Sequence, residues 1–302
     1  MASDNQERFR DLAARMSDLV PYGVFVAFVG ALNLLPYGWR VRLGGFVFAR
    51  VVAPLAGYRR RIEDNLRLIF PAMTEAQRAA VTAATARNIG RMAMELLSPK
   101  GLRQRALAAP VSGPGWDAMQ EAKAQNRPII LVSGHFGNYD VIRAGTIARG
   151  FRVGGIYRAL NNPWFNRYYL RNISTIGTPL FERGRRGIGE MVRFLRGGGT
   201  VAMLIDQHMH KGEPLDFMGQ TAMTALSAAE MALKYDALLV PCYGIRREDG
   251  LSFDAVFEAP IPHTTAVEMT QALNNSLQAR IEQNIDQWFW IHRRWKGGAP
   301  DA

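Results

Sequence analysis

The chain has 302 residues, of which 48% are hydrophobic and 21% are charged, and it carries a formal net charge of +11. This composition excludes a disordered or low-complexity protein, and the length allows one large or two smaller globular domains. The positive charge indicates an anionic partner, such as nucleic acid, anionic lipid headgroups or a phosphorylated substrate. The basic residues do not alternate with aromatic residues in a nucleic-acid-binding motif, so we expect no nucleic-acid partner. A single cysteine, Cys242, excludes an intrachain disulfide and is predicted to be a buried structural thiol.

The N-terminal part of the chain has the character of a membrane-associating region. Residues 1–18 are polar and predict an amphipathic helix, whereas residues 19–39 carry no charge. That uncharged stretch is about as long as the roughly 20 apolar residues that span a bilayer, although proline and glycine interrupt it. A basic cluster at residues 58–61 (YRRR) follows, and apolar surface beside basic charge holds proteins on anionic membranes. We therefore predict a membrane-associating helical region over residues 1–60, either interfacial or single-pass, and an α/β domain over residues 61–302.

Alternating helices and strands predict the architecture of the second region. The predicted helices cover residues 62–98, 116–126, 141–149, 164–173, 188–196, 224–235 and 266–295. The predicted strands cover residues 129–132, 151–157, 176–181, 201–205, 238–243 and 253–257. Strands that alternate with helices are typical of a largely parallel sheet with helices on its faces.

A histidine follows the strand that the sequence predicts to be buried on both faces. Residues 129–132 (IILV) suit a strand covered on both faces, and GHFGNYD follows at residues 134–140. Gly134 and Gly137 let the chain bend sharply there. His135 then lies at the carboxyl end of the strand, where open α/β sheets bind ligands. If the turn folds back, the carboxylate of Asp140 reaches the imidazole and makes it a general base. The alternative is that His135 only caps the helix that follows.

Polar residues also follow two other predicted strands, at Arg158 and at Asp206 with His208. If the strands are parallel, these side chains share one edge with His135. One interpretation is general-base catalysis, in which His135 takes a proton from a hydroxyl that attacks an acyl carbonyl and Arg158 binds a phosphate or the developing oxyanion. A second is a metal-dependent phosphoesterase, since His135, Asp140, Asp206, His208 and His210 are suitable ligand types. A third is a lipid-binding protein without catalysis. The absence of a Gly-x-Ser-x-Gly sequence speaks against an acyl-serine hydrolase.

The His-x-x-x-x-Asp segment resembles that of the bacterial lipid A biosynthesis (late) acyltransferases, a branch of the lysophospholipid acyltransferase superfamily. Further segments resemble this family in the same order along the chain: residues 60–71 (RRIEDNLRLIFP), 157–158 (YR), 205–207 (IDQ), 214–219 (PLDFMG) and 288–296 (WFWIHRRWK). The resemblance therefore covers most of the chain.

The resemblance implies a glycerolipid acyltransferase-like α/β fold and an O-acyltransferase. The donor would be an acyl thioester of acyl carrier protein or coenzyme A, and the acceptor a hydroxyl of a lipid A precursor or a related glycolipid or lysolipid. An aminolipid acceptor would need the same chemistry. The resemblance implies His135 as the base and Asp140 as its partner, with no metal, no cofactor and a location on the cytoplasmic face of the bacterial inner membrane. Substrate-binding residues implied at the pocket are Arg158, Asp206, Glu230, Gly134 and Asn138.

Overall fold

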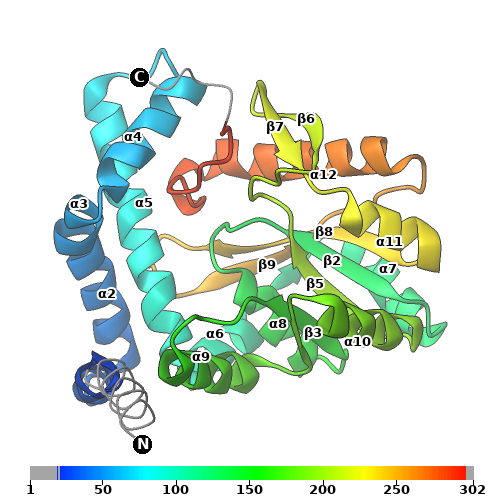
Figure 1. The fold of residues 1–302 in the computed structure, drawn as a ribbon, viewed down its shortest axis with the longest axis horizontal. Helices are drawn as coiled ribbons and strands as arrows, with labels where there is room; N and C mark the ends of the chain where they lie inside the picture. Colours follow the sequence, from blue (N-terminus) through cyan, green and yellow to red (C-terminus); the bar gives the residue numbers. More distant parts are fainter. Residues whose placement is uncertain (1–18, 20, 297–302) are drawn as a thin grey trace, which may run out of the picture.

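The computed structural model of the protein describes Leu19 and residues 21–296, so the helix predicted over residues 1–18 lies outside the described residues. A seven-stranded sheet organises the fold (Figure 1). In sheet order its strands are β1 (Val111–Ser112), β9 (Phe253–Phe257), β8 (Leu238–Arg246), β2 (Ile129–Ser133), β5 (Thr200–Leu204), β3 (Val153–Tyr157) and β4 (Leu180–Glu182). Within this sheet, as far as the structure describes it, β8 and β9 pair antiparallel, and all other neighbouring strands pair in parallel. The predicted α/β class with a mostly parallel central sheet flanked by helices is confirmed.

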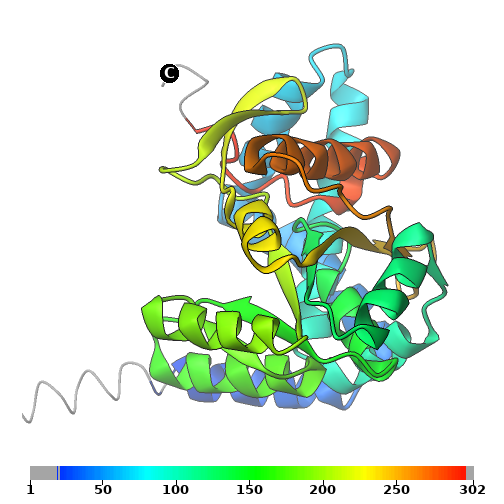
Figure 2. The same ribbon diagram turned by 90° about the vertical axis from the view of Figure 1, so that its right-hand side faces the viewer.

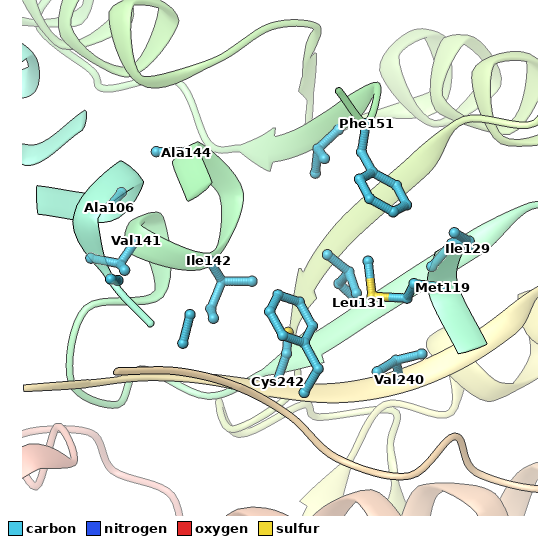
Figure 3. Close-up of a cluster of buried hydrophobic side chains, with 14 of the residues drawn as sticks. Ala106, Met119, Ile129, Leu131, Val141, Ile142, Ala144, Phe151, Val240 and Cys242 are labelled. Atoms are coloured by element: carbon cyan, nitrogen blue, oxygen red, sulfur yellow. The ribbon is translucent and has the colours of Figure 1, made fainter. Parts of the chain in front are cut away.

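Strand β2 lies in the middle of the sheet, and all five of its residues are buried. Ile129 and Leu131 face one layer of helices, formed by α6 (Pro99–Ala108), α7 (Pro114–Ala124) and α8 (Tyr139–Ala148). Ile130 and Val132 face the other layer, formed by α10 (Arg185–Arg196), α11 (Ser227–Tyr235) and α12 (Ala266–Gln283). Because successive side chains of a strand point to opposite faces, a continuous apolar run is what a doubly covered strand needs. Figure 3 shows the first of these clusters, in which Leu131 lies near Met119 and the buried, free thiol of Cys242.

The N-terminal helices pack along one side of this sheet (Figure 1). After the helix Pro21–Asn33 come α2 (Tyr37–Val47), η1 (Phe48–Val52), α3 (Ala53–Leu55), α4 (Tyr58–Ile69) and α5 (Glu75–Leu96). Helix α2 crosses α5 at short range through Gly44, Gly45 and Gly90. A Cβ atom at Gly90 would lie 2.5 Å from the carbonyl oxygen of Gly44, so only glycine allows this crossing.

The predicted membrane region contains several shorter apolar helices. Within residues 21–296, no single helix is both long and apolar enough to cross a bilayer. The segments Tyr37–Leu55 and Tyr58–Ile69 meet the length and composition requirements only as a pair, and the pair is bent by 86°. The division into residues 1–60 and 61–302 stays a prediction.

The structure also contains elements that the sequence did not predict, including α6 and β1, and two further differences lie near the His135 edge of the sheet. Part of the loop predicted between residues 206 and 223 is a hairpin of β6 (Glu213–Phe217) and β7 (Gln220–Thr224). Its two-residue turn, Met218 and Gly219, has positive φ at both positions, as tight hairpins require. Figure 2 shows this hairpin beside α12, where the amide nitrogen of Asp216 donates a hydrogen bond to the side chain of Gln271.

The helix predicted over residues 266–295 is too long, because α12 ends at Gln283. The chain continues as a short 3₁₀ turn, η2 (Ile285–Gln287), and then as an irregular tail to residue 296. Backbone groups of this segment bond to the His135 turn instead of forming helical hydrogen bonds. The amide of Gly137 donates to the carbonyl of Gln287, and the amide of Phe289 donates to the carbonyl of His135. The apolar residues of this segment are therefore buried against the sheet edge rather than along a helix face.

Candidate active site

The two residues at the centre of the site are brought together by the register of two neighbouring strands. Ser133, the last residue of β2, pairs with Leu204, the last residue of β5. His135 and Asp206 each lie two residues beyond those ends. Nδ1 of the His135 imidazole lies 2.8 Å from Oδ1 of Asp206, and the amide nitrogen of His135 donates to Oδ2 at 2.7 Å. The Asp206 side chain is fully buried, whereas the His135 side chain keeps 15% of its surface exposed.

The surroundings of Asp206 keep its carboxylate charged. Burial alone would raise the pKa of this carboxyl, but the imidazole of His135 and the hydrogen bonds from His135 lower that pKa well below its ordinary value. The indole Nε1 of Trp288 donates a further hydrogen bond to Oδ2 at 2.8 Å. A charged carboxylate at Nδ1 favours the tautomer with a proton on that nitrogen, which leaves the Nε2 lone pair of His135 free to accept a proton.

The contact predicted between Asp140 and His135 is not the one in the structure. Asp140 lies in the first turn of α8, and its Oδ1 accepts hydrogen bonds from Nε and Nη2 of Arg143 at 3.1 and 3.0 Å. Residues three apart on a helix face the same side, so the carboxylate turns along α8 rather than back to the strand end. In the described part of the chain, Asp206 takes the place at the imidazole that we expected for Asp140. A catalytic role for Asp140 stays a prediction.

Three rings surround the imidazole of His135. The ring centroids of Tyr139, Phe289 and His292 lie 5.5, 5.7 and 4.6 Å from that of His135. Burial, followed by the neighbouring His135, lowers the pKa of His292 to about 4, so His292 is neutral at pH 7. Its Nε2 atom is buried and has no hydrogen-bond partner among the described residues. Only the resemblance of the C-terminal segment pointed to this region of the sequence, and we did not single out His292 or Trp288 as site residues.

Both glycines of the His135 turn are required by close contacts. A Cβ atom at Gly134 would lie 3.0 Å from Oδ2 of Asp206 and 2.6 Å from a methyl carbon of Leu277. Gly137 has a φ of +54°, and a Cβ there would collide with the carbonyl oxygen of Gly244. Gly134 therefore makes room for the carboxylate that holds the imidazole, and Gly137 allows the chain to turn into α8.

Asn138 links the His135 turn to the N-terminal helices. Its side-chain oxygen caps α8 by accepting from the amide of Asp140, and its Nδ2 donates to Oε2 of Glu95 at 2.7 Å. Glu95, on α5, forms a buried ion pair with Arg246 of β8. These contacts position the turn, and the substrate-binding role predicted for Asn138 stays a prediction.

The remaining predicted substrate-binding residues are exposed. Arg158 directly follows β3, which is separated from β2 by β5, and it shares the carboxyl edge of the parallel strands with His135. Glu230 is exposed in the first turn of α11. In the described residues, no hydrogen bond joins either side chain to His135 or Asp206, so their substrate-binding roles stay predictions.

The ligands required by the phosphoesterase interpretation do not form a cluster. Within residues 21–296, no group of three or more His, Cys, Asp or Glu side chains lies close enough to hold a metal ion. The oxygens of Asp206 bond to His135 and Trp288, and Asp140 pairs with Arg143. His208 and His210 lie near each other, with ring centroids 5.0 Å apart, but no cluster with a carboxylate forms around them in the described part of the chain.

Comparison with known proteins decides between the remaining interpretations. The family model described as bacterial lipid A biosynthesis acyltransferase matches residues 14–297, which is nearly the whole chain. The chain belongs to this family. It is 26% identical over 271 residues to the lipid A biosynthesis lauroyltransferase of Escherichia coli strain K12, covering 87% of each chain. A lipid A biosynthesis acyltransferase of Haemophilus influenzae is 24% identical over 311 residues, with 96% of this chain and 95% of the relative covered.

A third relative is named for a different acyl group. The lipid A biosynthesis myristoyltransferase of E. coli strain K12 is 23% identical over 254 residues, covering 80% of this chain and 76% of the relative. Membership of the lipid A biosynthesis acyltransferase family establishes that this protein is an enzyme that transfers acyl groups other than aminoacyl groups. The resemblance found in the sequence is confirmed.

Proposed function

We propose that the enzyme moves a fatty acyl group from an acyl thioester to a hydroxyl group of a lipid A precursor or a related glycolipid or lysolipid. The thioester would be carried by acyl carrier protein or coenzyme A. One observation carries this proposal: the buried carboxylate of Asp206 holds Nδ1 of His135 and leaves Nε2 free at a partly exposed position. Family membership supplies the acyl-transfer class, and the relatives' names supply lipid A as the acceptor class.

The proposed reaction needs only these groups and the two substrates. Nε2 of His135 takes the proton of the acceptor hydroxyl while the hydroxyl oxygen attacks the thioester carbonyl carbon. The new C–O bond forms and the carbonyl becomes a tetrahedral oxyanion. When the C–S bond breaks, the thiolate leaves and the imidazolium returns the proton to its sulfur. Asp206 stabilises the imidazolium throughout, as the carboxylate of a catalytic triad does. The acyl thioester is a co-substrate, and no resident cofactor or metal is required.

Other predicted residues have narrower parts in this proposal. Arg158, exposed at the same sheet edge, would bind a substrate phosphate or the oxyanion. Glu230 would contribute a polar contact from α11. Gly134 supports the reaction indirectly, since it admits the Asp206 carboxylate beside His135.

We also propose that the enzyme is attached to the cytoplasmic face of the bacterial inner membrane. Exposed large apolar side chains are concentrated in the N-terminal helices, and this supports attachment. They include Val24, Val26, Phe28, Leu34, Leu35, Trp39, Leu43, Phe46, Val51, Val52 and Leu55. The basic residues of α4 that follow them would contact anionic headgroups.

Acyl transfer by purified protein tests the proposal. Acyl carrier protein and coenzyme A thioesters would be offered separately with a lipid A precursor, and the products identified by mass spectrometry. We expect His135→Ala to lower the rate by about 10²- to 10⁴-fold, which is the usual contribution of a general base. His263→Ala serves as the matched control, because His263 bonds to the carbonyl of Ala237 in another part of the fold. Full activity of the folded His135→Ala enzyme would overturn the proposal.

The acceptor lipid and the length of the acyl chain are determined by analysing the lipids of cells. Lipid mass spectrometry of cells with and without the protein would identify the missing acyl group and the lipid that carries it. A missing acyl group on an aminolipid would replace lipid A as the acceptor while preserving the chemistry. An unchanged lipid profile would contradict the proposal that the enzyme acylates a lipid of these cells.

A further inference from the structure

A basic cavity lies apart from His135, where the start of α2 meets α6 and α9 (Pro163–Ile176). Figure 1 shows these three helices meeting close to the N-terminal end of the described chain. The cavity has a volume of about 470 Å³. Its lining residues include Asn33, Arg40, Ser98, Lys100, Arg171 and Asn172.

The charge of the cavity wall is entirely positive. Arg40, Lys100 and Arg171 contribute one basic side chain from each of the three elements, and no lining residue is acidic. The guanidinium of Arg171 lies over the ring of Tyr168 at 4.9 Å, and that of Arg40 lies over the ring of Tyr37 at 5.8 Å. Stacking on a ring restrains an arginine side chain while its charge remains available to an anion.

The N-terminus of α6 opens into the same cavity. This helix has ten residues, and its N-cap residue, Ser98, makes no side-chain capping hydrogen bond. Pro99 at the first position has no amide proton, so the amides of Lys100 and Gly101 are the next donors at the helix end. Uncapped amides at the positive end of a helix dipole attract phosphate and other oxyanions.

Two buried polar side chains in the wall have no hydrogen-bond partner among the residues that the structure describes. The hydroxyl of Ser98 and Nδ2 of Asn172 make no hydrogen bond with any described residue, although their residues are only 5% and 6% exposed. A buried donor without a partner is costly, and buried polar groups are rarely left unpaired. Both residues line the cavity, so an anion with several oxygen atoms placed there would satisfy them.

The surroundings of the cavity indicate where such an anion comes from. Leu34, Leu35 and Trp39 are exposed, and they lie between Asn33 and Arg40, which line the cavity. Apolar side chains beside a basic pocket suit the boundary between acyl chains and headgroups. We propose that this cavity binds the phosphate group of a lipid headgroup. The site does not depend on the chemistry at His135, so its binding is measurable without acyl transfer.

Charge-neutral substitutions separate a built site from general electrostatic attraction. Binding of the full-length protein to vesicles of phosphatidylglycerol and phosphatidylcholine would be compared with binding to phosphatidylcholine alone. We expect Asn172→Leu and Ser98→Ala together to weaken the phosphatidylglycerol-dependent binding by about tenfold, as the loss of hydrogen bonds to a charged group predicts. Thermal unfolding confirms that the variant is folded. If it is not, Asn172→Asp, which places a negative charge where the phosphate would bind, is compared with Thr175→Asp at the rim of the same cavity, because both variants change the net charge equally and only the first should abolish a site built around Asn172.

A charge-matched comparison completes the test. Replacing Arg40, Lys100 and Arg171 by glutamine should weaken binding more than replacing the exposed Arg185, Arg193 and Arg196 of α10, although both variants lose three charges. Equal losses in the two triple variants, or no loss in the charge-neutral variant, would overturn the proposal.

The source of the phosphate is decided by steady-state kinetics. If the acceptor supplies it, the cavity variants raise KM for a phosphorylated glycolipid acceptor and leave KM for the dephosphorylated acceptor unchanged. If the surrounding membrane supplies it, vesicle binding falls and both KM values remain equal to those of the native enzyme at saturating vesicles. Both outcomes support a phosphate site. An inactive His135→Ala enzyme that still binds vesicles through the cavity keeps this inference separate from the catalytic proposal.

Discussion

Two buried aspartates follow strand ends at the His135 edge of the sheet, and their carboxylates have different partners. Asp206 is fully buried and accepts hydrogen bonds from the imidazole and amide of His135 and from the indole of Trp288. Asp140 is paired with Arg143, whose guanidinium also donates to the carbonyls of Ile173 and Gly177 at the end of α9. One carboxylate therefore orients the imidazole of His135, and the other connects α8 to α9 through Arg143. Burial alone does not distinguish them; the partner of each carboxylate does.

The largest effect is expected for Asp206→Asn. The amide keeps the shape of the side chain but removes the negative charge that orients the imidazole and stabilises the imidazolium. We expect kcat to fall by about 10²- to 10⁴-fold, since the contribution of the base is largely lost. Steady-state acyl transfer, with circular dichroism as the check of folding, measures this. A folded Asp206→Asn enzyme with native kcat would show that the contact at Nδ1 has no part in catalysis.

Asp140→Asn should act first on stability. The substitution removes the negative charge that neutralises the buried guanidinium of Arg143, and only uncharged oxygens remain as its partners. We expect the free energy of unfolding to fall by about 1–3 kcal/mol. Urea unfolding measures this loss. In a double-mutant cycle with Arg143→Gln, the two losses should be less than additive, because both substitutions break the same ion pair.

The activity of the same variant tests the catalytic role predicted for Asp140. A fall in kcat beyond the loss of folded protein would assign Asp140 a part in catalysis in addition to its ion pair. Unchanged stability of Asp140→Asn would contradict the structural role derived from its contact with Arg143.

The sequence predicted most of the fold and one member of the His135–Asp206 pair. The apolar run of β2 and the alternation of helices and strands predicted the sheet and placed His135 at its carboxyl edge. Asp206 was expected at the same edge, but its pairing with His135 depends on β5 being the direct neighbour of β2 in register. Strand order is not visible in a chain where β3 and β4 come between those two strands. The spacing of Asp140 was a local signal, and local helix geometry directed that carboxylate to Arg143 instead.

The C-terminal tail was missed for a similar reason. Its apolar residues are spaced as in a helix, yet Trp288 and Trp290 are fully buried in a cluster with Phe136 and Phe217. Hydrogen bonds from Gly137 and Phe289 fix the tail to the His135 turn. Such long-range pairing outweighs local helix preference, and only the assembled fold reveals it.

The burial of His292 beside His135 can be tested through the pH dependence of stability. Its pKa is lowered from 6.5 to about 4, so the unfolded chain binds its proton at a higher pH than the native protein does. Stability from this group is complete above pH 6.5 and is lost as the pH falls from 6.5 to 4, by about 2–3 kcal/mol. In urea unfolding, His292→Asn should lose less stability over this range than the native protein. His263→Asn is the matched control, and an identical pH dependence of the His292 variant would contradict the burial of that imidazole.

The smallest effect is expected for Trp288→Phe, which sharpens the comparison between the two aspartates. The substitution keeps an aromatic ring in the buried cluster but removes the indole donor to Oδ2 of Asp206, while the two hydrogen bonds from His135 remain. One hydrogen bond to a charged group contributes about 1.5 kcal/mol of stabilisation. If Trp288 holds the carboxylate of Asp206 in place through this bond, we expect kcat to fall by about tenfold. Combining Trp288→Phe with Asp206→Asn should add little further loss, since the donor then acts on a carboxylate that is absent. Combining it with Asp140→Asn should give additive effects, because no hydrogen bond joins Trp288 to the Asp140–Arg143 pair in the described chain. Additivity with Asp206→Asn instead would show that Trp288 acts on the reaction by a route other than this carboxylate.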